Sequence, residues 1–118
     1  MAFLEQENSM KRENRVRKNQ EFDDIISKRK VINVPGFCLY WNNNDVNKIR
    51  IGISVSKKIG NSVIRHKCKR QINEMIRNIC NLNDCYDIII IAKQKFLEQD
   101  FSTNYSCLEK AYKMIRGK

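Results

Sequence analysis

Hydrophobic and polar residues alternate without a break from Ile49 to Ser56, and this period of two predicts a β-strand. One side of the strand consists of branched apolar residues: Ile49, Ile51, Ile53 and Val55. The other side carries one arginine, one glycine and two serines, and the small side chains leave space above the sheet. We therefore expect one face of this strand in the core and the other toward solvent or a ligand.

Three further segments have the pattern of strands. Residues 31–33 and 37–41 are extended, with a Pro-Gly break between them. In the second of these, Tyr40 shares a face with Cys38, and the apolar residues of the strand occupy the opposite face. Tyr86–Ala92 is apolar almost throughout, which is typical of a strand covered on both faces.

The longest helical pattern begins at Asn61 or Ser62, either of which can cap a helix, and runs to about Cys80. Its apolar stripe, with spacings of three and four, predicts the buried side: Ile64, Cys68, Ile72, Met75, Ile76 and Ile79. The opposite arc is polar and mostly cationic: His66, Lys69, Arg70, Asn73 and Arg77. Arg65 and Lys67 fall near the borders of the stripe.

Two shorter helices complete the pattern. One begins at Asn19 and presents Phe22 and Ile25 on its apolar side. The last begins at Ser102 or Asn104 and carries a stripe at helical spacing: Leu108, Ala111, Tyr112 and Ile115. The predicted order of elements is therefore αβββαβα.

Length and composition indicate one domain with one modest core. The chain has 118 residues and a formal net charge of +10, so its expected partners are polyanions. We expect residues 1–13 to form a flexible polar arm and residues 14–118 to form the domain.

No segment resembles a signal peptide or a membrane span. The chain has five cysteines without a CxxC pair, which predict neither a disulfide framework nor a zinc site. The expected compartment is the cytoplasm.

Positive charge is concentrated in the segment 57–70, and no acid occurs between Asp45 and Glu74. A solvated helix normally carries acids among its bases, so the uninterrupted charge favours a bound polyanion. The segment lacks the second glycine that a phosphate-binding loop needs before its lysine. The apolar stripe is aliphatic and has core spacing, which argues against a membrane-surface helix. Recognition of a nucleic-acid backbone remains, with amides near the helix start available to a phosphate.

The stretch "RIGISVSKKIGNSVIRHKCKRQINE", from Arg50 to Glu74, resembles the signature region of the bacterial ribonuclease P protein subunit. The likeness continues through "RVRKNQEF", "FCLYW" and "YDIIIIAK", and covers roughly Asn14 to Ile115. It implies an α/β (α+β) sandwich with a mixed sheet of about four strands. It also implies that the long basic helix joins two parallel strands by a left-handed crossover, an exception to the usual handedness.

The resemblance implies two groups of RNA-binding residues. The first contacts the catalytic RNA of the enzyme: Lys57, Asn61, Arg65, His66, Lys67, Lys69 and Arg70. The second lines a cleft for the single-stranded 5′ leader of precursor tRNA: Arg15, Phe22, Ile26, Tyr40, Ser54 and Lys58. This chain departs from the family pattern at four of its positions: Ile26, His66, Lys67 and Asn73.

The chain offers no catalytic or metal-binding constellation of its own, because one histidine and scattered carboxylates do not make an acid–base pair or a two-metal site. The resemblance implies a subunit of an endoribonuclease whose RNA carries the active site and its Mg²⁺ ions. The protein would help remove the leader by binding both RNAs and promoting metal and substrate affinity. The alternative is a ribosomal-protein-like RNA-binding module without a role in cleavage. A DNA-binding protein is least favoured, since no helix-turn-helix spacing is present.

Overall fold

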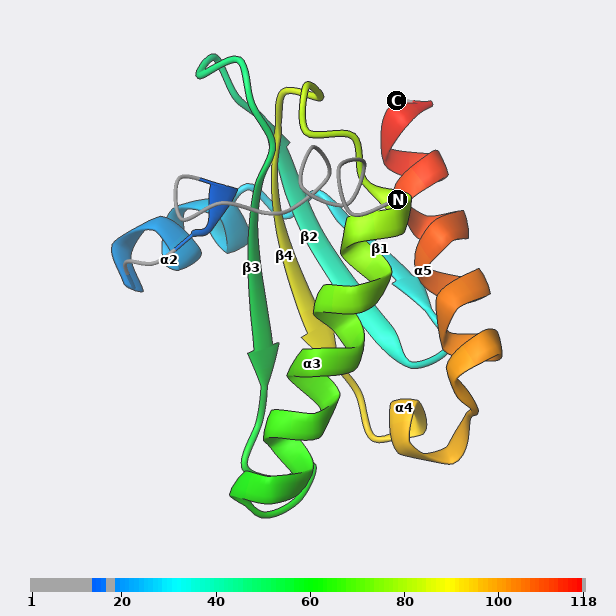
Figure 1. The fold of residues 1–118 in the computed structure, drawn as a ribbon. Coiled ribbons are helices and arrows are strands. Elements are labelled where there is room, and N and C mark those ends of the chain that lie inside the picture. Colours follow the sequence, from blue (N-terminus) through cyan, green and yellow to red (C-terminus); the bar gives the residue numbers. More distant parts are fainter. Residues whose placement is uncertain (1–13, 17–18, 118) are drawn as a thin grey trace.

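The computed structural model describes residues 14–16 and 19–117, and the arm predicted for residues 1–13 lies outside them. Its centre is a sheet of four strands, β1 (Val31–Val34), β2 (Phe37–Asn43), β3 (Arg50–Val55) and β4 (Tyr86–Ala92), in the order β1-β2-β4-β3 (Figure 1). The pairs β1–β2 and β2–β4 are antiparallel, and β3–β4 is parallel. The mixed sheet and the α+β class are as predicted.

Helices α3 (Ser62–Ile79) and α5 (Phe101–Arg116) lie side by side on one face of the sheet, and α2 (Asn19–Ser27) lies against the other (Figure 1). In the view of Figure 1, β3 and β4 both point downward, α3 passes in front of them, and β4 lies to the right of β3. This path is the left-handed crossover that the resemblance implied. No helix among the described residues is both long and apolar enough to cross a membrane.

The period of two in the strands divides the apolar residues between two clusters. The larger lies between the sheet and the α3–α5 layer and includes Phe37, Leu39 and Ile72, which are at most 1% exposed. The smaller lies under α2 and consists of Val16, Ile25 and Ile89 with partly buried neighbours. Both faces of β4 are therefore covered at Ile88, Ile89 and Ile90, whereas Tyr86, Asp87 and Ile91 are half-buried, so the predicted cover on both faces holds for the middle of the strand.

The segment before α2 runs along the outer edge of β3. Asn14 is 4% exposed and donates from Nδ2 to the carbonyl oxygen of Ile49 at 2.8 Å. The amide of Val16 donates to the carbonyl oxygen of Ile51 at 3.1 Å, and Arg15 forms a parallel bridge with the same residue. These contacts place Arg15 along the outer edge of β3, where it lines hollows together with Lys69 and Arg70 of α3.

Three details differ from the sequence prediction. A short helix, α4 (Lys95–Glu98), precedes α5, and α5 begins at Phe101 with Asp100 as its cap, earlier than either predicted start. Asn104, one of the predicted caps, is 1% exposed and donates to the carbonyl oxygen of Phe96. Ile64 was expected in the core and is 38% exposed, because the first turn of α3 extends beyond the end of the sheet (Figure 1).

Candidate nucleic-acid interface

The turn between β3 and α3 is held by a buried isoleucine and two hydrogen bonds, and its lysines are exposed to solvent. Ile59 is 8% exposed, and its amide donates to the carbonyl oxygen of Ser56 at 3.0 Å. The amide of Lys58 donates to Ser56 Oγ at 3.1 Å. The buried isoleucine and these bonds hold the turn, so the side chains of Lys57 and Lys58 lie outside on a defined backbone.

Asn61 is the cap of α3, and Ser62 is the first helical residue. The backbone of Asn61 is extended, and its Oδ1 accepts from the amide of Ile64 at 3.0 Å. The cap side chain is exposed, and the first turn carries no acid. The positive end of the helix dipole therefore adds to the lysine side chains of the preceding turn.

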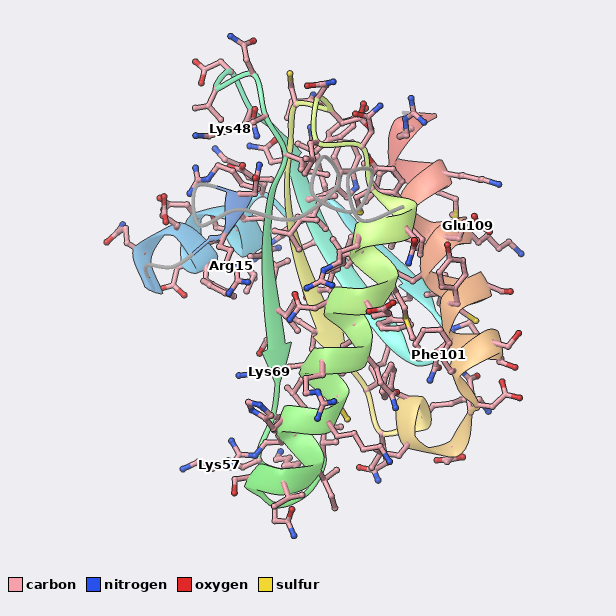
Figure 2. All side chains as sticks on the ribbon, in the orientation of Figure 1. Arg15, Lys48, Lys57, Lys69, Phe101 and Glu109 are labelled. Carbon is pink, nitrogen blue, oxygen red and sulfur yellow. The ribbon has the colours of Figure 1, made fainter. Side chains whose placement is uncertain are left out.

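The cations of α3 point in three directions, because four residues advance the helix by a little more than one turn. Lys69 lies on the side toward β3, and the helical repeat puts Arg65, four residues earlier, on the same side. Lys67 lies on the side toward α5, where it lines a hollow with Phe96 and Phe101. His66 and Arg70 are exposed between these two sides. Figure 2 shows Lys57 at the start of α3 and Lys69 beside β3.

None of these cations takes part in an ion pair within the described part of the chain. The one ion pair found on α3 there joins Arg77 and Glu74 at 4.0 Å, and both side chains are more than half exposed. Arg65 is half-buried, and its Nε is buried without a hydrogen-bond partner in the described structure. A buried donor without an acceptor costs free energy, and an RNA acceptor would relieve that cost only if the guanidinium moved outward to meet it.

A groove of about 390 Å³ lies between α2 and α3 along the edge of β3. Its walls include Arg15, Phe22, Lys69 and Asn73, and Gly52 lies on its floor. An adjoining hollow of about 230 Å³ shares Arg15 and Asn73 with the groove and adds Arg70 and Arg77. The structure thus brings Lys69, predicted for the catalytic RNA, next to Arg15 and Phe22, predicted for the leader.

The face of the sheet beneath α2 is only partly covered. Strand pairing places Tyr40, Ile89 and Gly52 in one row across three strands, and this row lies under α2. The next row consists of Cys38, Ile91 and Ser54, all half-buried. This open row adds Cys38 and Ile91 to the predicted cleft residues Tyr40 and Ser54. Ile91 was missed as a floor residue because the pairing of β2 with β4 is not visible in the sequence.

Phe22 and Ile26 lie on one side of α2, four residues apart. Phe22 packs against the small cluster beneath α2 and still lines the groove, so it serves both the core and a surface. Tyr40 packs against the same cluster and is half-buried. The aromatic rings of Phe22 and Tyr40 therefore lie close to the cations Arg15 and Lys69. We call this region under α2 the recess, and Lys58 lies beyond it at the end of β3.

Comparison with known proteins gives a consistent result. The family model described as Ribonuclease P matches residues 10–116. The ribonuclease P protein component of Mesoplasma florum is 41% identical over 103 residues, which cover 86% of this chain and 94% of the relative. That of Clostridium novyi is 40% identical over 111 residues, covering 92% of this chain and 88% of the relative.

Solved structures agree with the sequence matches. A Staphylococcus aureus RNase P protein mutant with defective mRNA degradation activity superposes with a TM-score of 0.83 at 34% identity, covering 91% of this chain and 92% of the other. The RNase P protein from Thermotoga maritima gives a TM-score of 0.70 at 28% identity, covering 80% and 90%. The alternative of a ribosomal-protein-like module is not favoured. This chain belongs to the family of ribonuclease P protein components, subunits of the endoribonuclease that processes the 5′ ends of tRNA.

Proposed function

We propose that this chain binds two RNAs at once, the catalytic RNA through α3 and the 5′ leader of precursor tRNA through the recess under α2. The observation that carries the proposal is the groove in which Arg15, Phe22 and Lys69 come together. Residues from the N-terminal segment, α2 and α3 contribute to it, so both predicted surfaces meet there. A leader strand lying in this recess would pass directly beside the catalytic RNA.

The leader is the natural ligand for the recess because it is single-stranded. Unpaired bases stack on aromatic rings whatever their sequence, and Phe22 and Tyr40 offer such rings. Ile26 and Ser54 add apolar contact and a hydroxyl group, and the open row with Ile91 gives the strand a floor. Arg15 and Lys58 supply cations for its phosphates at the two ends.

The catalytic RNA would contact the outer side of α3 and the turn before it. The residues assigned to this contact are Lys57, Asn61, Arg65, His66, Lys67, Lys69 and Arg70. Arg65 has no ion pair within the described residues, so its charge is available to a phosphate. Lys69 lies where the two RNAs converge, so it would reduce the repulsion between their phosphates.

We infer that the catalytic Mg²⁺ ions are held by the RNA. Among the described residues, no three His, Cys, Asp or Glu side chains are grouped so that they could hold a metal ion. The protein would raise the affinity for these ions indirectly, by holding the substrate and neutralising phosphate charge around it. This reaction would take place in the cytoplasm.

The test is cleavage of a precursor tRNA by a bacterial ribonuclease P RNA at low Mg²⁺, with and without the protein. We expect the protein to increase cleavage, and the gain to be larger for a substrate with a long leader than for one with a single-nucleotide leader. Tyr40→Ala should reduce the gain for the long leader only. No gain with either substrate, or the same gain for both, would contradict the proposal.

A further inference from the structure

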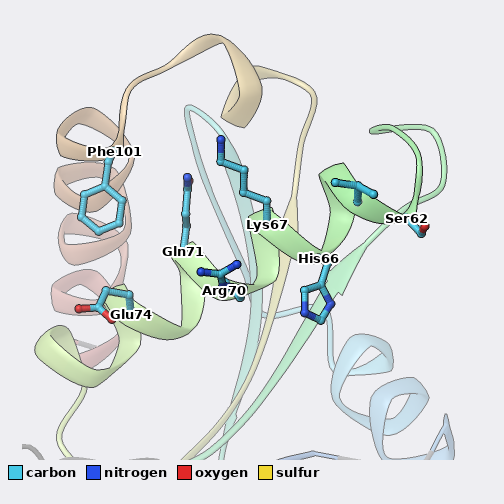
Figure 3. Close-up of a pocket in the computed structure, with 8 residues that line it drawn as sticks. Ser62, His66, Lys67, Arg70, Gln71, Glu74 and Phe101 are labelled. Carbon is cyan, nitrogen blue, oxygen red and sulfur yellow. The ribbon is translucent and has the colours of Figure 1, made fainter.

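A second groove lies on the opposite side of α3, between that helix and the start of α5 (Figure 3). It has a volume of about 750 Å³, and its walls include Val63, Lys67, Arg70, Gln71, Glu74 and Phe101. A hollow of about 380 Å³ continues from it past Leu97 and shares Lys67, Gln71 and Phe101. Lys69 and Gln71 are two residues apart and point to opposite sides of the helix, so this groove is separate from the leader recess.

Three large apolar side chains in and beside the groove are exposed to solvent. Phe101 is 42% exposed, Leu97 is 41% exposed and Val63 is 74% exposed. Figure 3 shows the Phe101 side chain projecting from α5 toward Gln71 and Glu74 of α3. Its ring contacts Tyr105 at a centroid distance of 6.3 Å with the planes tilted by 35°. That contact is on the α5 side, and the groove gives a planar ligand access to the ring.

The position of Phe101 is fixed by the backbone on both sides of it. Asp100 caps α5, and its Oδ1 accepts from the amide of Thr103 at 2.8 Å. The buried Asn104 accepts from Gln99 Nε2 at 2.6 Å and donates to the carbonyl oxygen of Phe96 at 3.0 Å. The backbone that carries Phe101 is therefore held in place before any ligand arrives, so only the side-chain torsions of the ring remain to be fixed on binding.

The charge of the groove selects among possible ligands. Lys67 and Arg70 lie on α3 across from the ring, and neither has an ion pair within the described residues. A second copy of the chain would bring another +10 of formal charge, so self-association is disfavoured. A flat ring facing two cations fits a nucleotide, whose base stacks and whose phosphates are anionic. In Figure 3, Gln71 lies between Phe101 and the two cations, and Glu74 lies below the ring, so the polar atoms of both side chains can meet the edge of a base.

We propose that an unpaired nucleotide of the catalytic RNA inserts between α3 and α5, with its base stacked on Phe101 and its flanking phosphates beside Lys67 and Arg70. The inference rests on the proposed function, in which α3 binds that RNA, and it adds a site that reads an unstacked base. It also gives Lys67 a role distinct from that of Lys69. The catalytic RNA would then contact both the outer face of α3 and the side of α3 that faces α5.

The test measures binding of the full chain to the ribonuclease P RNA of Mesoplasma florum over a range of salt concentrations. Phe101→Ala and Phe101→Leu should weaken binding at least about fivefold, because each base stacked on an aromatic ring contributes that much or more. Phe101→Tyr should stay within about twofold of the wild type. Stacking releases no counterions, so the salt dependence should keep its slope in all three variants.

Met114→Ala is the matched control, because Met114 is a 43% exposed apolar residue elsewhere on α5. It should bind like the wild type, and thermal unfolding should confirm that every variant folds. Chemical probing of the RNA gives a second measurement. One unpaired nucleotide should be protected by the wild type and by Phe101→Tyr, and should become reactive again with Phe101→Leu.

The result separates this inference from the proposed function. If Arg70→Ala lowers the slope of the salt dependence but Phe101→Leu binds and protects the RNA like the wild type, the stacking site is wrong and the α3 contact stands. If Phe101→Ala weakens binding and Phe101→Leu does not, the groove binds by apolar contact and the nucleobase is excluded. If the wild type does not bind the RNA, both proposals fail together.

Discussion

The ring of Phe22 lies directly on the backbone of Gly52. A Cβ atom at position 52 would stand 2.6 Å from Phe22 Cζ and 3.0 Å from Ile89 Cδ1. Real Cβ atoms do not approach other carbons so closely, so only glycine permits this contact. The missing side chain on β3 is therefore what lets α2 pack on the sheet and form one wall of the groove proposed for the leader.

Gly52→Ala should displace Phe22 and destabilise the fold by about 1–3 kcal/mol, the usual cost of overpacking. Urea unfolding measures the loss, and leader binding should weaken with it. Gly117→Ala is the matched glycine control, because a Cβ there would lie 3.5 Å from the carbonyl oxygen of Lys113, an ordinary van der Waals contact. Phe22→Leu in the Gly52→Ala background should restore part of the stability. Simple additivity of the two changes would contradict the contact.

Arg50 ties α2 to the sheet by charge. Its guanidinium forms an ion pair with Glu21 of α2 and lies 3.8 Å from Asp87 of β4, and all three side chains are at most one-third exposed. Arg50→Ala should cost about 1–3 kcal/mol, because it leaves carboxylates in a partly buried place without their cation. The control is Arg77→Ala, whose exposed pair with Glu74 should contribute less than about 1 kcal/mol. Equal losses in urea unfolding would show that Arg50 does not act as a tether.

The cations of α3 should be visible in the salt dependence of RNA binding. Arg65→Ala and Arg70→Ala should each lower the log–log slope by about 0.7–0.9, the contribution of one phosphate contact. Lys113→Ala, an exposed cation on α5, should leave the slope unchanged. If all three variants keep the wild-type slope, the basic face of α3 is merely solvated.

Except for the short helix α4, the order of strands and helices and most of the core followed from periodicity, because each strand or helix repeats its apolar positions at its own spacing. Phe37 and Leu39 alternate with Cys38 and Tyr40; Phe37 and Leu39 lie in the larger cluster, whereas Tyr40 packs against the smaller one. Pairing between strands leaves no such trace in the sequence. The row of Cys38, Ile91 and Ser54 depends on β2, β4 and β3 being neighbours in one register, so it could not be predicted.

The errors at Ile64 and Asn104 have the same origin. A helical period assigns Ile64 to the buried side of α3, but it cannot say where the sheet beneath the helix ends. Asn104 has the chemistry of a cap, and here that chemistry is used inside the fold to join α4 to α5. The position of Lys69 beside Phe22 likewise depends on how α2 and α3 flank β3. The local sequence pattern identifies the chemical character of these residues, and tertiary packing determines which contacts they make.

Tyr112 joins α5 to the loop between α3 and β4, and its contribution to stability should depend on pH. Its hydroxyl donates to Asp84 and accepts from the amide of Asn81 at 3.1 Å. Burial, and then the bond to Asp84, raises the pKa of Tyr112 above its ordinary value near 10. The folded state therefore favours the neutral phenol, and the stability that this gives is complete below pH about 10 and declines as the pH rises above it.

Tyr112→Phe should unfold more easily at pH 7 by about 1–2 kcal/mol, and its deficit in unfolding free energy relative to the wild type should shrink above pH about 10. Urea unfolding of both proteins at pH 7 and pH 10.5 measures the difference, since other titrating groups affect the two alike. A deficit that stays constant with pH would mean that the phenol ionises in the folded protein as readily as in the unfolded chain.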